Sequence, residues 1–157
     1  MSPRTILFSL PLLSSLIACT MTPPAGELID GRLRPCPNRP NCVTSDSSVT
    51  DSDYSVSPIS FHRSQAEAWQ TVQTVLIELG GQIIESGPTY AWATFSSTIF
   101  HFVDDVELRM EPQENRIHVR SGARIGYWDL GVNRKRVEKI RKLFLELSSE
   151  SAETITR

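Results

Sequence analysis

The feature that most constrains the fold is a succession of runs that alternate between apolar and polar residues. Four such runs follow one another, at residues 82–85, 90–95, 100–110 and 115–121. Ser-Gly-Pro-Thr at 86–89 separates the first two, and Glu-Pro-Gln-Glu at 111–114 separates the last two. Period-two alternation bounded by glycine, proline and short polar residues is typical of half-buried strands joined in hairpins. The succession predicts an antiparallel β-meander of four strands, with residues 56–61 as a fifth, edge strand.

Two amphipathic helices are predicted, one before and one after the meander. Ser64 and Glu67 form a capping box, and apolar residues then recur at helical spacing up to Gly80-Gly81, which predicts a helix over 64–79. A second apolar stripe, which predicts a helix over 133–147, consists of Val137, Ile140, Phe144 and Leu147. This order of elements indicates an α+β fold with both helices packed on one face of the sheet, because a parallel sheet would need a helix between successive strands.

The first 18 residues have the outline of an export signal. Arg4 supplies the positive charge, residues 6–17 form a short apolar run, and Ala18 precedes Cys19. This segment resembles the lipobox of bacterial lipoproteins, in which the cysteine carries diacylglycerol and is acylated with a fatty acid such as palmitate. The alternatives are a cleaved signal peptide followed by an incidental cysteine, and an uncleaved anchor, for which the apolar run is too short. Thr20 is not an aspartate, which favours the periplasmic side of the outer membrane if the source is Gram-negative.

The chain of 157 residues has the length of one domain. We expect a lipoprotein signal peptide at 1–18, a lipidated N-terminus and tether at 19–32, one α+β domain at 33–147 and a polar, frayed tail at 148–157. Within the domain, residues 33–57 hold a disulfide-bearing loop and a linker rich in Ser and Asp, and residues 58–147 form the core.

Cys36 and Cys42 remain once Cys19 is assigned to lipid. An even number of cysteines in an exported protein indicates a disulfide, and three prolines stiffen this segment. Free thiols and a metal site are the alternatives. A metal would need two further ligands, and the three histidines of the chain form no ligand pattern. We therefore expect a disulfide, no metal and no cofactor.

Asp104 falls on the apolar face of the strand predicted at 100–110. Folding back across 111–114 places Asp104 opposite Ser121 and Asp105 opposite Arg120. A carboxylate among apolar neighbours costs several kcal/mol unless it is paired, and the expected partners of Asp104 are Ser121 and Arg124. Three interpretations follow: a functional polar pocket, a structural ion pair, or a bulge that turns the carboxylate outward.

Charge is distributed unevenly along the chain. Residues 116–142 carry nine basic and two acidic side chains, a net +7, whereas residues 43–111 carry ten acidic and two basic ones, a net −8. The formal charge of the whole chain is −2, which argues against a dedicated nucleic-acid binder. Arg134 begins a run of three cations in the first turn of the last predicted helix, where the helix dipole disfavours them. Asn133 is the expected N-cap, and Asp129, the Asp104-Asp105 pair or a bound anion is expected to offset the cations; a solvated, internally paired face is the alternative.

Three motifs occur in order. They are Pro35-Cys36-Pro37-Asn38-Arg39-Pro40-Asn41-Cys42-Val43, Asp104-Asp105-Val106-Glu107-Leu108-Arg109 and the segment from Arg120 to Arg136. Together they resemble domain-of-unknown-function family 1499, over about residues 33–142. That family often has Arg-Ser-Ala-Ser-Arg where this chain has Arg120-Ser121-Gly122-Ala123-Arg124, and Ser at the position of Trp128. The resemblance implies no substrate, cofactor or mechanism.

The leading hypothesis is a membrane-anchored envelope lipoprotein whose domain binds an anionic envelope component or a partner protein, without catalysis. The candidate cluster consists of Asp104, Asp105, Arg120, Ser121, Arg124, Asp129, Asn133 and Arg134. A second hypothesis is a hydrolase in which the carboxylates of Asp104 and Asp105 act with Arg120 or Arg124 as an electrophilic clamp. A third, weaker one is a lipid-carrying cavity between the meander and the last helix. Nucleic acid is not an expected partner.

Overall fold

The computed structural model describes residues 26–46, 53–97 and 102–155. The strands are β1 (Cys42–Thr44), β2 (Ile59–Ser60), β3 (Gln82–Ser86), β4 (Tyr90–Ser96), β5 (Val103–Glu111) and β6 (Arg116–Ala123). The helices are α1 (Gln65–Glu78), a 3-10 turn η1 (Pro112–Glu114) and α2 (Val132–Ile155). The predicted signal peptide and Cys19 lie outside the described residues. Within those residues, no helix combines the length and hydropathy that a bilayer-spanning segment requires.

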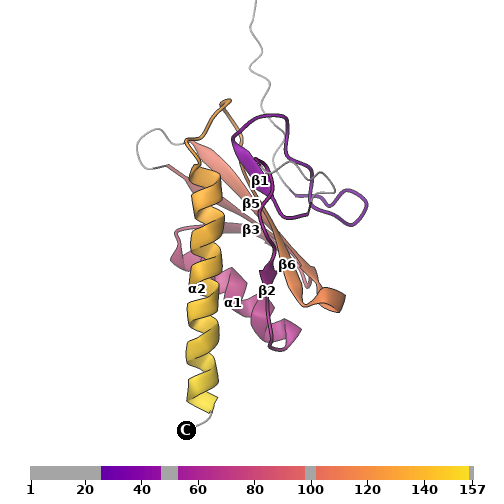
Figure 1. The fold of residues 1–157 in the computed structure, drawn as a ribbon, viewed down its shortest axis with the longest axis vertical. Helices are drawn as coiled ribbons and strands as arrows, with labels where there is room; N and C mark the ends of the chain where they lie inside the picture. The colour runs from indigo at the N-terminus through magenta and orange to yellow at the C-terminus, as the bar shows by residue number, and fades with distance from the viewer. Residues whose placement is uncertain (1–25, 47–52, 98–101, 156–157) are drawn as a thin grey trace, which may run out of the picture.

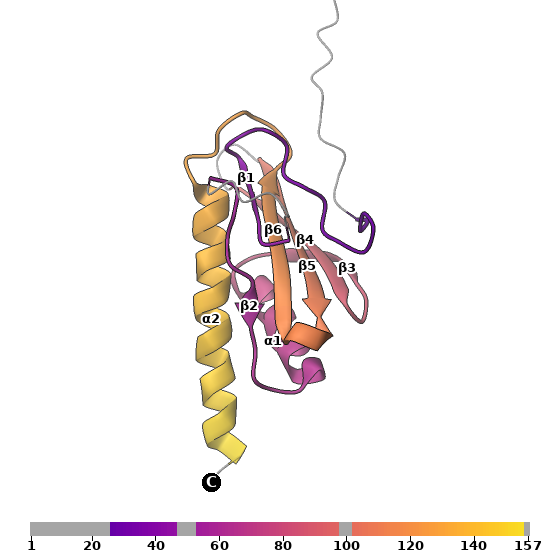
Figure 2. The ribbon, with the colours of Figure 1, turned by 45° about the vertical axis from the view of Figure 1, so that its right-hand side comes forward.

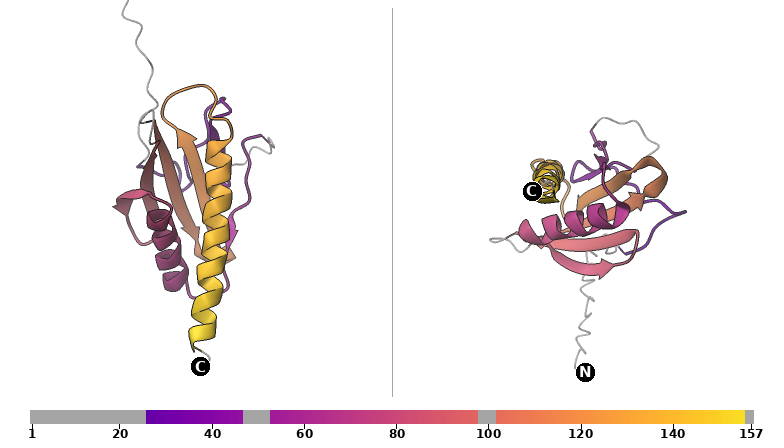
Figure 3. Two further views of the ribbon diagram at one scale, coloured as in Figure 1. Left: turned by 90° about the vertical axis from the view of Figure 1, so that its left-hand side faces the viewer. Right: turned by 90° about the horizontal axis from the view of Figure 1, so that it is seen from below.

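The strands form one antiparallel sheet in the order β1-β6-β5-β4-β3, and β2 pairs with the other end of β6. Both α1 and α2 lie against the same face of this sheet (Figures 1 and 3). The predicted α+β class and the placement of the helices are confirmed. The described sheet has six strands rather than four or five, because β1 comes from the segment predicted as loop.

The apolar core fills the space between the sheet and the helices. Helix α1 contributes Trp69, Val72 and Leu76, and α2 contributes Ile140 and Phe144. The strands contribute Ala91, Ala93, Phe95, Val106, Leu108, Met110, Ile117 and Val119. These residues are the apolar positions of the alternating runs. Period-two alternation therefore predicts which side chains of the sheet face the helices.

Helix α1 begins and ends as its sequence predicts. Ser64 accepts a hydrogen bond from the Glu67 N–H, and the Glu67 carboxylate accepts one from the Ser64 N–H, which completes the capping box. Gly80 takes a positive φ of 87° after the last turn. Its N–H donates to the Ile77 carbonyl, and the Gly81 N–H donates to the Leu76 carbonyl, which satisfies the free carbonyls at the helix end.

Helix α2 differs from its predicted form at both ends. Asn133 is not the N-cap, because it lies within the helix and its side chain is buried. The Asp129 carboxylate caps the helix instead, accepting hydrogen bonds from the N–H groups of Gly131 (2.9 Å) and Asn133 (2.8 Å). At the other end the helix continues to Ile155, beyond the Leu147 predicted as its last residue and through most of the segment predicted as a frayed tail.

The pairing between β5 and β6 is shifted by two residues from the predicted register. Glu111 pairs with Arg116, so the turn occupies residues 112–115 rather than 111–114. Asn115 closes it in the left-handed conformation at φ 50°. Asp104 therefore lies opposite Ala123, not Ser121, and Arg120 lies opposite Glu107, not Asp105. A shift of two keeps every side chain on its predicted face, which is why the pattern alone did not reveal it.

Candidate functional site

Charged side chains of β5 form a buried layer on the sheet face opposite the helices. Asp105, Glu107 and Arg109 are 4%, 0% and 8% exposed. Residues 26–46 run along this face (Figure 2), and Leu33 and Cys42 from that segment are themselves buried. The three charges share a face because they occupy alternate positions of one strand. Period-two alternation did not reveal that a segment preceding the meander covers them.

Asp105 is paired from β4 on one side and from Arg124, the residue that follows β6, on the other. Arg124 donates through Nε and Nη2 to the two carboxylate oxygens at 2.9 and 2.8 Å, and Trp92 Nε1 donates to Oδ1 at 2.8 Å. The Arg124 guanidinium also lies 5.9 Å from the centre of the Trp92 ring. The hydrogen bonds to Asp105 raise the pKa of Arg124 above its ordinary value. This carboxylate is therefore held by a bidentate charge pair.

Glu107, the next residue on this face, has the same kind of environment. Arg120 Nη1 donates to Oε2 at 2.9 Å, and the Tyr90 hydroxyl donates to Oε1 at 2.9 Å. Burial, and then the negative charge of Glu107, raises the pKa of Tyr90 well above its ordinary value. The hydrogen bond from the phenol to Glu107 is therefore that of a protonated tyrosine.

Arg109 closes the layer near the turn. Its Nε and Nη2 donate to the Asp46 carboxylate at 2.7 and 3.0 Å, and its Nη1 donates to Glu111 at 2.6 Å. The Leu33 N–H also donates to Asp46, at 2.9 Å. Burial by itself raises the pKa of Asp46, but the hydrogen bonds from Arg109 and Leu33 outweigh burial and lower it. Asp46 therefore ties the N-terminal segment to β5.

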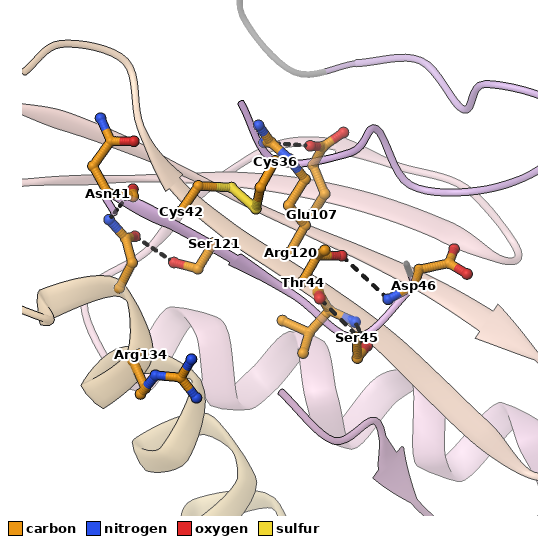
Figure 4. The surroundings of a disulfide bond; sticks show 12 residues. Cys36, Asn41, Cys42, Thr44, Ser45, Asp46, Glu107, Arg120, Ser121 and Arg134 are labelled. Atoms are coloured by element: carbon orange, nitrogen blue, oxygen red, sulfur yellow. Dashed lines mark hydrogen bonds and ion pairs between the residues drawn. A yellow bond between two sulfur atoms is a disulfide. The ribbon is translucent and has the colours of Figure 1, made fainter. Parts of the chain in front are cut away.

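The predicted disulfide between Cys36 and Cys42 is present, with a Cα–Cα distance of 5.6 Å. It lies beside Glu107 and Arg120 over the charged layer (Figure 4). Cys42 pairs with Gly122 across β1 and β6, and a Cβ placed on Gly122 would lie 3.0 Å from Cys42 Sγ. The absence of a side chain at residue 122 thus lets the disulfide pack directly on the sheet.

Asp104 lies on the helix-facing side of the sheet, and its predicted partners are wrong. Arg136 Nη2 donates to its Oδ2 at 2.7 Å, whereas Arg124 pairs with Asp105. Ser121 donates to Asn133 Oδ1 at 2.5 Å and accepts from Arg136 Nη1 at 3.2 Å. Burial raises the pKa of Asp104, and the positive charge of Arg136 opposes that rise.

The eight predicted site residues are therefore not one cluster. Asp105, Arg120 and Arg124 lie on the covered face, and Asp104, Ser121, Asp129 and Asn133 lie on the helix side. Arg134 donates to the backbone carbonyls of Ser55 and Asp53. The role of Asp46 was not predicted, because a single aspartate in a Ser/Asp-rich run carries no pattern. The pairing of Arg136 was not predicted either, because it depends on how α2 meets β5.

Ser45 and His118 are the nearest arrangement to a nucleophile and base. Ser45 Oγ lies 3.4 Å from His118 Nδ1. However, the same hydroxyl accepts from the Val119 N–H at 2.8 Å, and His118 Nδ1 also lies 3.1 Å from the Ser45 carbonyl oxygen. The Ser45 hydroxyl and the His118 ring thus bond to backbone groups of the neighbouring segment, which is not the arrangement of an activated nucleophile. Among the described residues, no group of three or more His, Cys, Asp or Glu side chains is arranged to hold a metal ion.

A hollow of about 290 Å³ opens beside the first turns of α2. Its lining combines apolar side chains with three cations: Leu79, Phe95, Val132, Lys135, Arg136 and Lys139. Arg136 is committed to Asp104, but Lys135 and Lys139 are exposed and have no carboxylate within 4.0 Å among the described side chains. In this hollow, the ammonium groups of Lys135 and Lys139 therefore lie next to apolar side chains.

Comparison with known proteins places the chain in a family. Residues 32–144 match the family model described as a protein of unknown function, DUF1499. The chain belongs to this family. A search of curated proteins finds no match. The matched residues 32–144 include the disulfide, the buried charged side chains of β5 and the start of α2.

Proposed function

We propose that this protein is a lipid-anchored envelope lipoprotein whose domain is a non-catalytic module that binds an anionic amphiphile. Cys19 carries the lipid and keeps the domain at a membrane. The hollow lined by Leu79, Phe95, Val132, Lys135, Arg136 and Lys139, named here the α2 hollow, receives the ligand. An outer-membrane, periplasm-facing location follows if the source is Gram-negative.

The observation that carries the proposal is the contrast between paired and available cations. Arg120, Arg124 and Arg136 each hold a carboxylate within 2.9 Å, so their charge is already neutralised. Lys135 and Lys139 lack such a partner among the described residues and stand at the rim of the α2 hollow. An anionic headgroup in the hollow meets these two lysines, whose charge no described carboxylate neutralises.

The apolar part of the α2 hollow selects an amphiphile over a simple anion. Leu79, Phe95 and Val132 offer surface on which an acyl or glycerol portion loses contact with water. A volume of about 290 Å³ accommodates a headgroup with the first carbons of a chain, not a whole lipid. This size argues against the lipid-carrying alternative, and the paired carboxylates of Asp104 and Asp105 argue against the hydrolase.

A titration of the mature lipoprotein in neutral detergent tests the headgroup site. The titrants are short-chain phosphatidylglycerol, short-chain phosphatidylcholine and inorganic phosphate, each at two salt concentrations. We expect phosphatidylglycerol to bind best and to weaken at high salt, because the lysines supply exposed charge. A surface lysine contributes about 1 kcal/mol toward an anionic lipid, so Lys135→Glu with Lys139→Glu should cost at least about tenfold in affinity.

Lys142→Glu is the matched control, since Lys142 lies on the same helix outside the hollow and pairs with Glu146 at 3.7 Å. It should bind like the wild type. Equal affinity for the two lipids, or an unchanged affinity in the double lysine variant, would contradict the headgroup site.

The lipid anchor is tested by a separate experiment. A tagged fatty acid should label the wild type and leave Cys19→Ser unlabelled.

A further inference from the structure

The connection between β6 and α2 exposes large apolar side chains in close succession. Ile125, Tyr127, Trp128 and Leu130 are 55%, 70%, 67% and 64% exposed. The connection lies at the end of the molecule opposite the C-terminus (Figure 1). Single exposed apolar residues are ordinary, but four among six consecutive residues form a patch. We call residues 125–130 the apolar loop.

Hydrogen bonds hold the backbone of the apolar loop in place. The exposure of its apolar side chains is therefore part of the folded structure. Asn41 Nδ2 donates to the Gly126 carbonyl at 2.6 Å, and the Asp129 carboxylate accepts from the Gly131 and Asn133 N–H groups. Leu130 has a left-handed backbone with φ 58°, which costs free energy for a residue with a side chain. These contacts fix the backbone while leaving the apolar side chains outside the core.

The side chains of the apolar loop have the chemistry of a membrane-interface contact. Tyr and Trp combine an apolar ring with a polar tip and are enriched at the level of lipid headgroups, whereas Ile and Leu gain by entering the acyl region. Val132 then connects the apolar loop to the α2 hollow, whose Lys135 and Lys139 match an anionic surface in charge. An apolar centre flanked by lysines is the pattern of a protein that lies on an anionic bilayer.

The start of the described chain lies against Trp92, on the side of the sheet from which the apolar loop begins. A Cβ placed on Gly26 would lie 3.5 Å from the Trp92 ring, and the guanidinium of Arg124, the residue before the apolar loop, lies 5.9 Å from the centre of the same ring. Cys19 precedes Gly26 by seven residues, and a chain of that length reaches at most about 25 Å. A lipid on Cys19 therefore keeps the apolar loop within reach of the bilayer, where a second contact has a high effective concentration.

We propose that the apolar loop inserts Tyr127, Trp128 and Leu130 into the interface of an anionic bilayer and so orients the domain on the membrane. This inference rests on the lipid anchor of the proposed function and adds a second, protein-borne contact. The occupant of the loop is thus a lipid surface, rather than a protein partner or a second copy of the chain.

Fluorescence of Trp128 in vesicles tests the proposal. The mature lipoprotein is reconstituted into vesicles of phosphatidylethanolamine and phosphatidylglycerol, and the signal of Trp128 is obtained by subtracting that of Trp128→Phe. This variant keeps an aromatic ring and should fold normally. We expect the Trp128 emission to shift to the blue, its quenching by aqueous acrylamide to fall at least threefold compared with neutral detergent, and lipids brominated near the headgroup to quench it.

Two results would overturn the insertion of the loop. If acrylamide quenches Trp128 in vesicles as strongly as in detergent, the Trp128 ring lies in water and the loop does not insert. Trp128 that is shielded from both acrylamide and brominated lipid is covered by protein, which would make a partner or a second copy the occupant.

The lysine titration separates this proposal from the proposed function. Brominated lipid quenching of Trp128 together with an unchanged titration in the Lys135→Glu, Lys139→Glu variant would remove the headgroup site and leave the loop insertion standing. A lysine-dependent titration with a water-exposed Trp128 would do the opposite.

Discussion

Arg136 and Asp104 join the first turn of α2 to β5 through an ion pair with an N–O distance of 2.7 Å. The Arg136 guanidinium also lies 4.8 Å from the centre of the Phe95 ring, so the cation is placed between a carboxylate and an aromatic face. This contact explains one of the three cations at the start of α2, which the helix dipole alone disfavours. Asp104 compensates Arg136 from within the fold.

Replacing Arg136 with Met should destabilise the domain in a pH-dependent way. Burial raises the pKa of Asp104 and Arg136 opposes the rise, so the variant raises that pKa further. A fully buried pair loses about 3–5 kcal/mol when one partner is removed, and the partial exposure of these side chains (14% and 13%) reduces the expected loss to about 2 kcal/mol at pH 7. The folded pKa of Asp104 lies above its ordinary value of 3.8 in the wild type and higher still in the variant, so the penalty should fade as both folded proteins take up the proton above pH 3.8 and should be absent at about pH 3.

Urea unfolding at pH 7 and at pH 3 measures this difference. Lys142→Met serves as the control, because Lys142 is exposed and its partner Glu146 lies 3.7 Å away at the surface. An Arg136→Met penalty of equal size at both pH values would mean that lost packing, and not the unpaired carboxylate, sets the cost.

Asp46→Asn should flatten the acid side of the stability curve. The folded pKa of Asp46 is lowered, mainly because Arg109 and the Leu33 N–H outweigh burial, so the ionised group stabilises the fold above pH 3.8. That contribution is lost as the pH falls through the lower, folded pKa. Unfolding free energies measured from pH 7 to pH 2 should therefore decline less steeply in the variant. Glu114→Gln, which removes an exposed carboxylate paired with Arg116, is the control for the loss of a surface ion pair.

The core face of the sheet was predictable, and the covered face was not. Apolar residues at period two identify the positions that face the helices, and a register shift of two leaves them unchanged. The opposite face of β5 has a sequence that is typical of a solvent-exposed face, because Asp105, Glu107 and Arg109 are charged. It is buried because residues 26–46 return over it, and no local pattern encodes such a long-range contact.

The division of the candidate site residues between two faces was not predicted, for a related reason. Asp104 and Asp105 are adjacent in sequence, so a pattern-based analysis groups them, yet alternate side chains of a strand point to opposite faces. Their arginine partners come from different elements, Arg136 from α2 and Arg124 from the connection before it. The disulfide was predictable because it depends on compartment and cysteine count rather than on register.

Gly81→Ala should destabilise the domain far more than Gly87→Ala. A Cβ on Gly81 would lie 2.7 Å from both the Leu76 carbonyl oxygen and the Phe95 ring, and neither the helix end nor the core ring moves freely. Overpacking of this kind costs about 1–3 kcal/mol. A Cβ on Gly87 meets the Tyr90 carbonyl oxygen at 3.6 Å, which is ordinary contact. Thermal unfolding of the two variants decides the matter, and equal losses would show that the close approach at Gly81 relaxes.

Reduction of the Cys36–Cys42 disulfide should weaken the domain measurably without unfolding it. A closed loop of seven residues contributes about 2.4 kcal/mol in the chain-entropy model, and its ends are six positions apart. Reductant should lower the unfolding free energy of the wild type by about this amount. It should leave a Cys36→Ser, Cys42→Ala variant unchanged, and alanine at residue 42 avoids a polar group at a position that is 3% exposed. Alkylation before reductant should label neither thiol in protein taken from the envelope; two labelled thiols there would show that the bond does not form in the cell.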